Sequence, residues 1–506
     1  MELNIFDKLA LGWGIAGSFH NLAFCFIGVF LGTLVGVLPG LGPVAAISLL
    51  LSITYKMDTV TALIMLAGIW YGAAYGGSTT SILVNIPGES SSVITCLDGY
   101  QMARKGRAGP ALGIAAFGSF IAGTLSVAGL MYLAPMLGQA ALSIGPPEYF
   151  AMAVCGLTLV TSLSRGPVIK GLIMTLLGLL VGCVGADPIS GVQRFTFGSF
   201  TLLDGIGIVP VAMGMFGIGE VLENIGSQIR AEEIYETKIK GLFPSFKDWK
   251  ASFWPIIRGS VIGFFVGILP GPSVTIAAFT SYAVEKRISK HPNKFGTGAI
   301  EGVAGPESAN NAATSGAFIP LVSLGIPANV SMALFMGALM IHGVTPGPLF
   351  IRDYPVIFWG FIISMYLGNA LLLVLNLPLI GLWVRIVKIP YALLFPFILL
   401  FCLFGAYTLN NNSAEVLIML VFGVLGYLNR KVGLEGAPFI LALVLGPMME
   451  RCLRQSLLIS QGDPLIFISR PISGIIILVA FASLFFAITP AFKKKKEESI
   501  EPKEEK

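Results

Sequence analysis

Two stretches rich in hydroxyl and amide side chains interrupt an otherwise apolar chain, and both contain groups that hold anions. The first runs from Ser78 to Ser92 and breaks at Ile86-Pro87-Gly88. The second runs from Glu301 to Asn329 and breaks at Ile326-Pro327-Ala328. A helix that starts inside a membrane presents unpaired backbone N–H groups and the positive end of its dipole. Such a break therefore favours the binding of an anion.

We predict that both stretches form re-entrant hairpins that bind a carboxylate substrate. Hydroxyl runs cap helix starts, so we expect Ser78 to Ser81 to open a helical segment and Asn329 to cap the helix after the second break. We expect the two hairpin tips near Asn85 to Ser92 and near Asn310 to Ser315 with Gly325 to Asn329. The substrate-binding candidates are Ser78, Thr79, Thr80, Asn85, Pro87, Gly88, Ser90, Asn310, Asn311, Thr314, Ser315, Gly325, Pro327 and Asn329. The alternatives are a simple kink at the first break and an exposed loop over the start of the second stretch.

One uncommon phrase occurs in both halves of the chain. Gly36-Val37-Leu38-Pro39-Gly40 returns as Gly267-Ile268-Leu269-Pro270-Gly271. A proline between glycines lets backbones approach closely and frees a carbonyl oxygen. The ion-coupling candidates are Gly36, Pro39, Gly40, Gly267, Pro270, Gly271, Glu89 and Glu307. Amide and carbonyl oxygens suit Na⁺, whereas Glu89, Glu301 or Glu307 can carry H⁺, and the sequence leaves both ions open.

Basic residues and metal ligands are missing from the places where a charged substrate would need them. Residues 31–48, 76–95, 261–284 and 299–345 contain no Lys or Arg, so an anion must be held by helix ends, amides and hydroxyls. The six cysteines and three histidines are scattered without metal-ligand spacing, and we expect no metal site and no cofactor. An intramembrane enzyme is a remote alternative, because the chain has no GxSxG or HExxH motif.

Composition places the chain in a membrane. Of its 506 residues, 55% are hydrophobic and only 12% are charged, and the mean hydropathy is +0.83. A protein surrounded by water has about twice that share of charged residues. Much of the basic character lies in short loops and at the C-terminus, which is typical of membrane orientation and argues against nucleic-acid binding. We therefore predict an all-α polytopic membrane protein in contact with lipid.

The apolar segments predict about twelve membrane spans plus the hairpins, because about 20 apolar residues cross the hydrocarbon layer. The predicted spans are 22–38, 58–75, 110–136, 147–163, 168–185, 205–221, 254–269, 354–378, 391–408, 413–428, 436–449 and 474–490. Shorter or polar segments at 42–55, 78–100, 272–284, 296–313 and 314–342 lie between them. Non-helical backbone at membrane depth must be buried in protein or line a cavity, so these segments are the expected interior.

Loop charges predict that the two halves have opposite orientations. Basic residues at 104–107 follow the first break, whereas the equivalent loop of the second half, 343–354, holds only Arg352. In the loop that precedes the interrupted segment the charge bias reverses: the first half has Lys56 alone, and the second half has a basic cluster at 286–294. Because basic loops lie on the cytoplasmic side, this exchange of charge predicts that the two halves form an inverted repeat. Arg451 and Arg454 fall on the wrong side of this prediction.

These patterns divide the chain into six predicted parts. We expect a retained amphipathic N-terminal segment (1–20), a first membrane repeat (21–225), a cytoplasmic connector (226–255), a second membrane repeat (256–455), an extra C-terminal span (456–490) and a charged cytoplasmic tail (491–506). The loop from 185 to 204 is expected outside the cytoplasm.

At its motifs the chain resembles the large membrane subunit of the tripartite tricarboxylate transporter family. The resemblance rests on Gly36 to Gly40, on Gly76 to Ser81 with Asn85 to Glu89, and on Gly305 to Asn311 with Gly325 to Pro327. It implies a multi-pass permease of the bacterial inner membrane, driven by an ion gradient. It also implies a small membrane subunit and a periplasmic solute-binding protein that delivers an organic acid such as citrate. A self-sufficient carboxylate symporter is the alternative within transport.

Overall fold

The computed structural model describes residues 4–38, 42–164, 166–187, 189–224, 241–387 and 391–489, and these are predominantly helical. Within this part of the chain the strands are β1 (Gly185–Ala186) and β2 (Gln193–Arg194), which pair antiparallel. The predicted all-α class is confirmed. Pro39, Gly40, the predicted tail and residues 226–240 of the predicted connector lie outside the described residues.

The first half contains α1 (Ile5–Ala16), α2 (Phe19–Val37), α3 (Pro43–Thr54), α4 (Thr59–Val84), α5 (Val93–Thr95), the π-helical η1 (Cys96–Tyr100), α6 (Gln101–Arg104), α7 (Ala108–Ala141), α8 (Pro146–Leu163), α9 (Val168–Gly182), the 3₁₀ turn η2 (Phe200–Leu202), α10 (Ile208–Ala212), the π-helical η3 (Met213–Ile218) and α11 (Gly219–Asn224). The second half contains α12 (Phe246–Ile268), α13 (Ser273–Ile288), the 3₁₀ turn η4 (Pro292–Lys294), α14 (Glu301–Gly316), α15 (Phe318–Leu324), α16 (Val330–Ile341), α17 (Phe350–Asp353), α18 (Pro355–Asn376), α19 (Ile380–Val387), α20 (Tyr391–Asn410), α21 (Ser413–Lys431), α22 (Gly436–Ile459), α23 (Ile466–Ser469) and α24 (Pro471–Ile488). The start of α12 falls within the predicted connector.

One closely packed helix pair occurs in each half, and glycines make both pairs possible. Gly28, Gly32 and Gly36 of α2 lie against backbone carbonyl groups of α4, where a Cβ atom would overlap them. Gly259, Gly263 and Gly267 of α12 lie in the same way against α14. Small residues at this spacing let helices associate inside a membrane. Both glycine rows end at the repeated pentapeptide, so the sequence repeat is also a repeat of packing; the opposite orientation of the halves stays a prediction.

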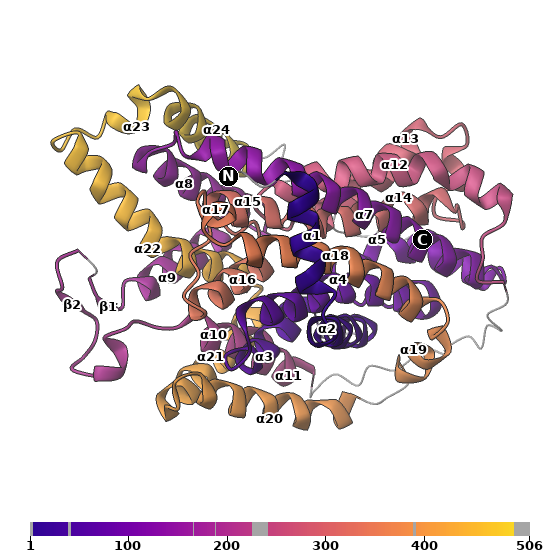
Figure 1. The fold of residues 1–506 in the computed structure, drawn as a ribbon, viewed down its shortest axis with the longest axis horizontal. Helices are drawn as coiled ribbons and strands as arrows, with labels where there is room; N and C mark the ends of the chain where they lie inside the picture. The colour runs from indigo at the N-terminus through magenta and orange to yellow at the C-terminus, as the bar shows by residue number, and fades with distance from the viewer. Residues whose placement is uncertain are drawn as a thin grey trace.

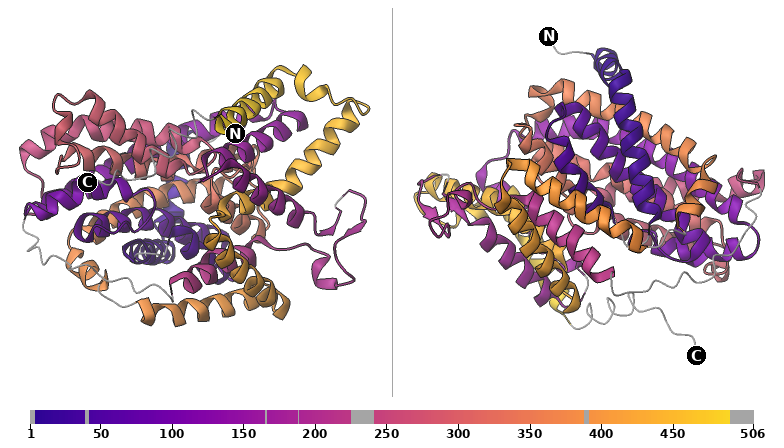
Figure 2. Two further views of the ribbon diagram at one scale, coloured as in Figure 1. Left: turned by 180° about the vertical axis from the view of Figure 1, so that it is seen from behind. Right: turned by 90° about the horizontal axis from the view of Figure 1, so that it is seen from below.

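Eight described helices are long and apolar enough to cross a membrane, namely α2, α4, α7, α12, α18, α21, α22 and α24. The apolar window of α4 is entirely buried, whereas that of α24 is only 17% buried, so α4 is central and α24 peripheral. Figure 1 shows α4, α7 and α18 near the middle of the molecule, with α14 beside them toward α12 and α13. The views of Figure 2 show the C-terminal helices, in yellow, at the edge of the molecule. The larger number of about twelve spans stays a prediction.

The β1–β2 hairpin projects from one edge of the molecule (Figure 1) and is attached to α22 by ion pairs. Arg454 lies 2.8 Å from Asp187 of the hairpin, and Arg194 lies 2.8 Å from Glu450. The pKa of the Asp187 carboxyl is held well below its usual range, because it accepts N–H groups from the following backbone and lies beside Arg454. The Arg454 charge, which contradicted the loop-charge pattern, is therefore neutralised within the protein.

The glycine packing of the second half can be tested by adding one methyl group. Gly263→Ala places a Cβ onto the carbonyl oxygen of Ala309, and we expect a loss of about 1–3 kcal/mol of stability because α12 must move away from α14. Gly14→Ala in α1 is the matched control, since a Cβ there meets no atom within 4 Å. Thermal unfolding in detergent measures both variants; equal melting temperatures would contradict the packing.

Candidate functional site

Both predicted interruptions are present, and each begins at a residue with left-handed backbone. α4 ends at Val84, and Asn85 has φ of 58°. α15 ends at Leu324, and Gly325 has φ of 70°. Glycine adopts this conformation without strain, and asparagine is one of the few other residues that do so regularly. Asn329 caps α16 as expected, by accepting the N–H of Met332 at 3.1 Å.

Two local predictions are wrong. Ser78 to Ser81 does not open a helix but lies in the last turns of α4, and Asn310 to Ser315 is not a hairpin tip but lies within α14. The hydroxyls of Thr80 and Ser81 bond to Gly77 O in the preceding turn of their own helix, at 3.1 and 2.9 Å, so they need no helix start. The alternative of an exposed loop is wrong as well, because α14 is buried from Gly302 to Gly316.

Each interruption touches the repeated pentapeptide of its own half. Gly88 lies so close to the carbonyl oxygen of Gly36 that a Cβ would overlap it. In the second half the Gly271 N–H donates to the carbonyl oxygen of Ala328 at 2.8 Å. Gly271 has φ of 127°, a conformation that requires glycine. The two duplicated motifs are therefore one structural unit in each half.

Polar side chains from both halves meet at Glu307 of α14. Its side chain is 1% exposed, and its two carboxylate oxygens accept hydrogen bonds from Ser78 of α4 and Thr95 of α5. Ser119 of α7 donates to its backbone carbonyl oxygen at 3.3 Å. Glu307 thus ties the end of α4 to the middle of α14.

A second polar contact joins the first interruption to the second half. Asn310 Nδ2 donates to Glu89 Oε1 at 3.1 Å, and Ser91 donates to the same oxygen. Nearer the surface, the hydroxyls of Ser90 and Thr275 lie 2.9 Å apart, which places the first interruption against the start of α13.

The remaining candidate residues lie around these contacts of Glu307 and Glu89. Asn311 bonds to Ser119 Oγ at 2.7 Å, and the carbonyl oxygen of Thr314 accepts the Trp70 indole N–H at 3.1 Å, so both residues serve packing against α7 and α4. Asn85 is exposed. The second interruption, with Gly325, Pro327 and Asn329, packs near Pro346 and the second pentapeptide, and Ser315 is buried in α14.

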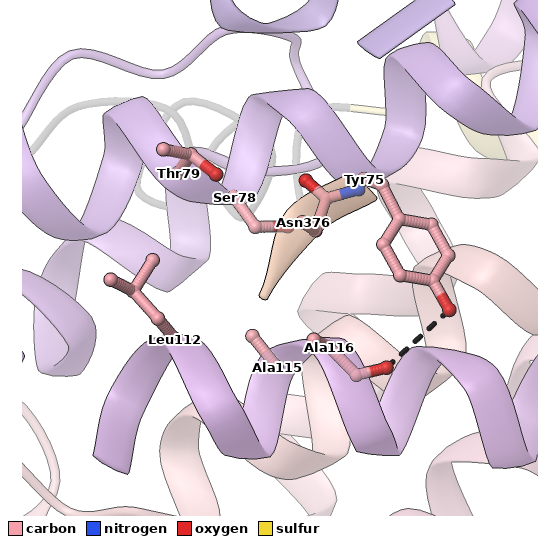
Figure 3. Close-up of a pocket in the computed structure, with 7 residues that line it drawn as sticks. All are labelled: Tyr75, Ser78, Thr79, Leu112, Ala115, Ala116 and Asn376. Carbon is pink, nitrogen blue, oxygen red and sulfur yellow. Dashed lines mark hydrogen bonds between the residues drawn. The ribbon is translucent and has the colours of Figure 1, made fainter. Parts of the chain in front are cut away.

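A small pocket lies beside Ser78, between α4, α7 and the end of α18 (Figure 3). It is lined by Tyr75, Ser78, Thr79, Leu112, Ala115, Ala116 and Asn376. The Tyr75 hydroxyl donates to the carbonyl oxygen of Ala116 at 3.4 Å, the contact drawn in Figure 3. Tyr75 and Asn376 were not among the predicted site residues. Asn376 could have been identified as an amide side chain within the apolar segment 354–378.

Asp98, also missed, connects the halves through backbone. This fully buried carboxylate accepts the N–H groups of Gly296, Gly298 and Ala299 at 2.9, 2.7 and 2.7 Å. Its other oxygen accepts the Tyr282 hydroxyl at 2.9 Å. The first half therefore holds the backbone that leads into α14. An acidic residue within the predicted interior segment 78–100 was the signal that could have identified it.

Comparison with known proteins identifies a relative that covers nearly the whole chain. The family model described as the tripartite tricarboxylate transporter TctA family matches residues 22–441. The chain is similar to the "Uncharacterized 52.8 kDa protein in TAR-I ttuC' 3'region" of Agrobacterium vitis, with 49% identity over 495 residues and 98% of each chain covered. The "Uncharacterized protein in TAR-II ttuC' 3'region" of the same organism is 49% identical over 236 residues, which are 47% of this chain and 98% of that protein. No solved structure matches.

The Asp98 contact predicts a defined local effect. Asp98→Asn replaces an acceptor oxygen with a donor that faces other donors, and we expect a loss of about 1–3 kcal/mol of stability. Faster hydrogen exchange at Gly296, Gly298 and Ala299 is expected with it. Asp353→Asn is the control, because Asp353 is exposed and pairs only with its neighbour Arg352 at the surface. Unchanged exchange in Asp98→Asn would refute the anchoring role.

Proposed function

We propose a transport function for this chain, which belongs to the tripartite tricarboxylate transporter TctA family. The family is a transporter family, so the chain is a multi-pass membrane permease and not an enzyme. The full proposal is the large subunit of a tripartite importer of the bacterial inner membrane. In it a periplasmic binding protein delivers a tricarboxylate or related organic acid, a small membrane subunit completes the complex, and a Na⁺ or H⁺ gradient supplies the energy.

The observation that carries this proposal is the pair of interrupted helices, each in contact with its own glycine-proline pentapeptide. Interrupted helices in matching positions of two membrane repeats are the usual substrate and ion sites of secondary transporters. In the proposal, backbone N–H groups at the two interruptions and the nearby hydroxyls and amides bind the substrate carboxylates. The sequence around both interruptions has no Lys or Arg to do so.

The candidate residues are largely closed to solvent, so the proposal requires movement. Thr80, Asn310 and Thr314 are all buried. Substrate reaches them only when one interruption separates from the helices around it. Two repeats of opposite orientation, which we include in the proposal, provide this opening alternately on each side of the membrane.

Substitution at the first interruption tests the site. Thr80 lies beside Gly88, and Thr80→Leu replaces its hydroxyl with a larger apolar group. We expect uptake by the complete complex in proteoliposomes to fall by about tenfold or more. Thr408→Leu in α20 is the matched control, since Thr408 also bonds a glycine carbonyl of its own helix at 3.1 Å. Citrate is the first of a panel of radiolabelled di- and tricarboxylates. Equal uptake by the two variants would remove Thr80 from the site.

The tripartite arrangement has its own test. Proteoliposomes that contain the two membrane subunits are measured with and without the soluble binding protein. Uptake is expected to depend on the binding protein, because delivery precedes transport in the proposal. Uptake at the full rate without it would favour the self-sufficient symporter instead.

A further inference from the structure

Two acidic side chains lie near the amide of Asn310, one on the same helix and one bonded to it. Glu307 and Asn310 are on the same face of α14, one turn apart. Asn310 Nδ2 contacts Glu89 Oε1 at 3.1 Å. We refer to Glu89, Glu307 and Asn310 as the carboxyl cluster.

The carboxyl cluster differs in its partners from two other buried carboxylates, Glu285 and Glu148. Glu285 is bound by Arg258 through two hydrogen bonds of 2.7 and 2.6 Å, and Glu148 by Arg470 at 2.6 Å. Glu307 receives only hydroxyl donors, and no ion pair to it exists among the described residues. A carboxylate that is buried without a positive partner is costly, so the cluster favours taking up one positive charge.

An unpaired amide oxygen is a second indication that the carboxyl cluster favours taking up a positive charge. Asn310 is 1% exposed, and its Oδ1 has no hydrogen-bond partner among the described residues. A buried acceptor without a donor costs about 1–3 kcal/mol. The cluster therefore holds more acceptors than donors, and a protonated carboxyl group adds a donor.

Packing favours a proton over a metal ion. Both oxygens of Glu307 already contact hydroxyl groups directly. Around Glu89 the packing is tight, since a Cβ at Gly77 would lie 3.0 Å from Glu89 Cγ and 3.2 Å from Ser92 Oγ. A metal ion needs room between its oxygen ligands, whereas a proton needs none.

Among the titratable groups near Glu307, Glu89 is the acidic group whose charge is not already engaged by another partner of opposite charge or by several N–H donors. The titratable groups on the elements around Glu307 are Tyr75 on α4, Glu89, Cys96 and Asp98 on and before η1, Arg258 on α12, and Tyr282 and Glu285 on α13. Arg258 is already engaged by Glu285, and Asp98 by backbone N–H groups and Tyr282. Helix α7 contributes the neutral Ser119.

A polar path connects the cluster to the surface. Ser90 is exposed and contacts Thr275, and Glu89 next to it is half-buried. From Glu89 a hydrogen bond leads to Asn310, which lies one turn from Glu307 on α14. A proton can therefore enter at the first interruption, where the substrate is proposed to bind.

We propose that the carboxyl cluster binds one exchangeable proton and that this proton is the coupling ion of transport. The inference rests on the proposed function. On the side of uptake, a carboxylate oxygen of the cluster takes up H⁺ as the substrate binds. On the other side the carboxyl group releases H⁺, and the cluster returns to its starting charge with no other reactant.

The test uses Glu307→Gln in the complete complex in proteoliposomes, with the organic acid that the wild-type complex transports. Glutamine is uncharged, as a protonated carboxyl group is, and can still bond to Ser78 and Thr95. We expect accumulation driven by a pH gradient to fall by about tenfold or more, while exchange of internal for external substrate persists and loses its pH dependence. Asp353→Asn, at an exposed carboxylate that pairs with Arg352, is the control and is expected to behave as wild type.

The outcomes separate the proposals. Accumulation by Glu307→Gln at the wild-type level and with the wild-type pH profile overturns the proton site, and so does wild-type accumulation that follows a Na⁺ gradient and ignores pH. Absence of both uptake and exchange by the wild-type complex would instead count against the proposed function. Glu89→Gln gives a second test that does not depend on the folding of Glu307→Gln, and the same loss of pH-driven accumulation is expected there.

Discussion

Inside a membrane a polar group must find its hydrogen bonds within the protein, and this requirement organises the structure. The end of α4 and the whole of α14 carry hydroxyl, amide and carboxyl side chains that cannot face lipid. They are accordingly enclosed by α7, α12 and α13, while the strongly apolar α24 remains at the periphery. The most polar part of the interior is thereby placed between the end of α4, the first interruption and α14.

Glycine packing brings the parts of this interior together. The rows on α2 and α12 allow backbone contact with α4 and α14, and each row ends at a pentapeptide that touches the interruption of its half. Helix packing and site geometry are therefore coupled. A displacement of α2 or α12 would move the pentapeptide and the interruption with it, as the proposed opening and closing of the site requires.

Part of the candidate site followed from residue type and position. Ser78, Glu89, Asn310 and Glu307 were selected because polar residues next to Pro and Gly in an apolar chain require partners, and the structure brings them together. Asn311 was selected for the same reason, but its amide bonds to α7. The hairpin tip expected at Asn310 to Ser315 is a helix instead, because small residues and short hydroxyls fit the crowded contact with α12.

The sequence alone determined the membrane class, the positions of both interruptions and the duplication of the pentapeptide. These features depend on composition and on the backbone limits of Gly, Pro and Asn, which act locally. Only the tertiary structure decided which polar groups pair. Thr95 and Ser119 were unremarkable in the chain and became partners of Glu307 by packing, as Thr275 became the partner of Ser90. Ser78 and Glu307 are separated by 229 positions, and no local preference specifies a contact over that distance, because it arises only when the helices that carry them are packed side by side.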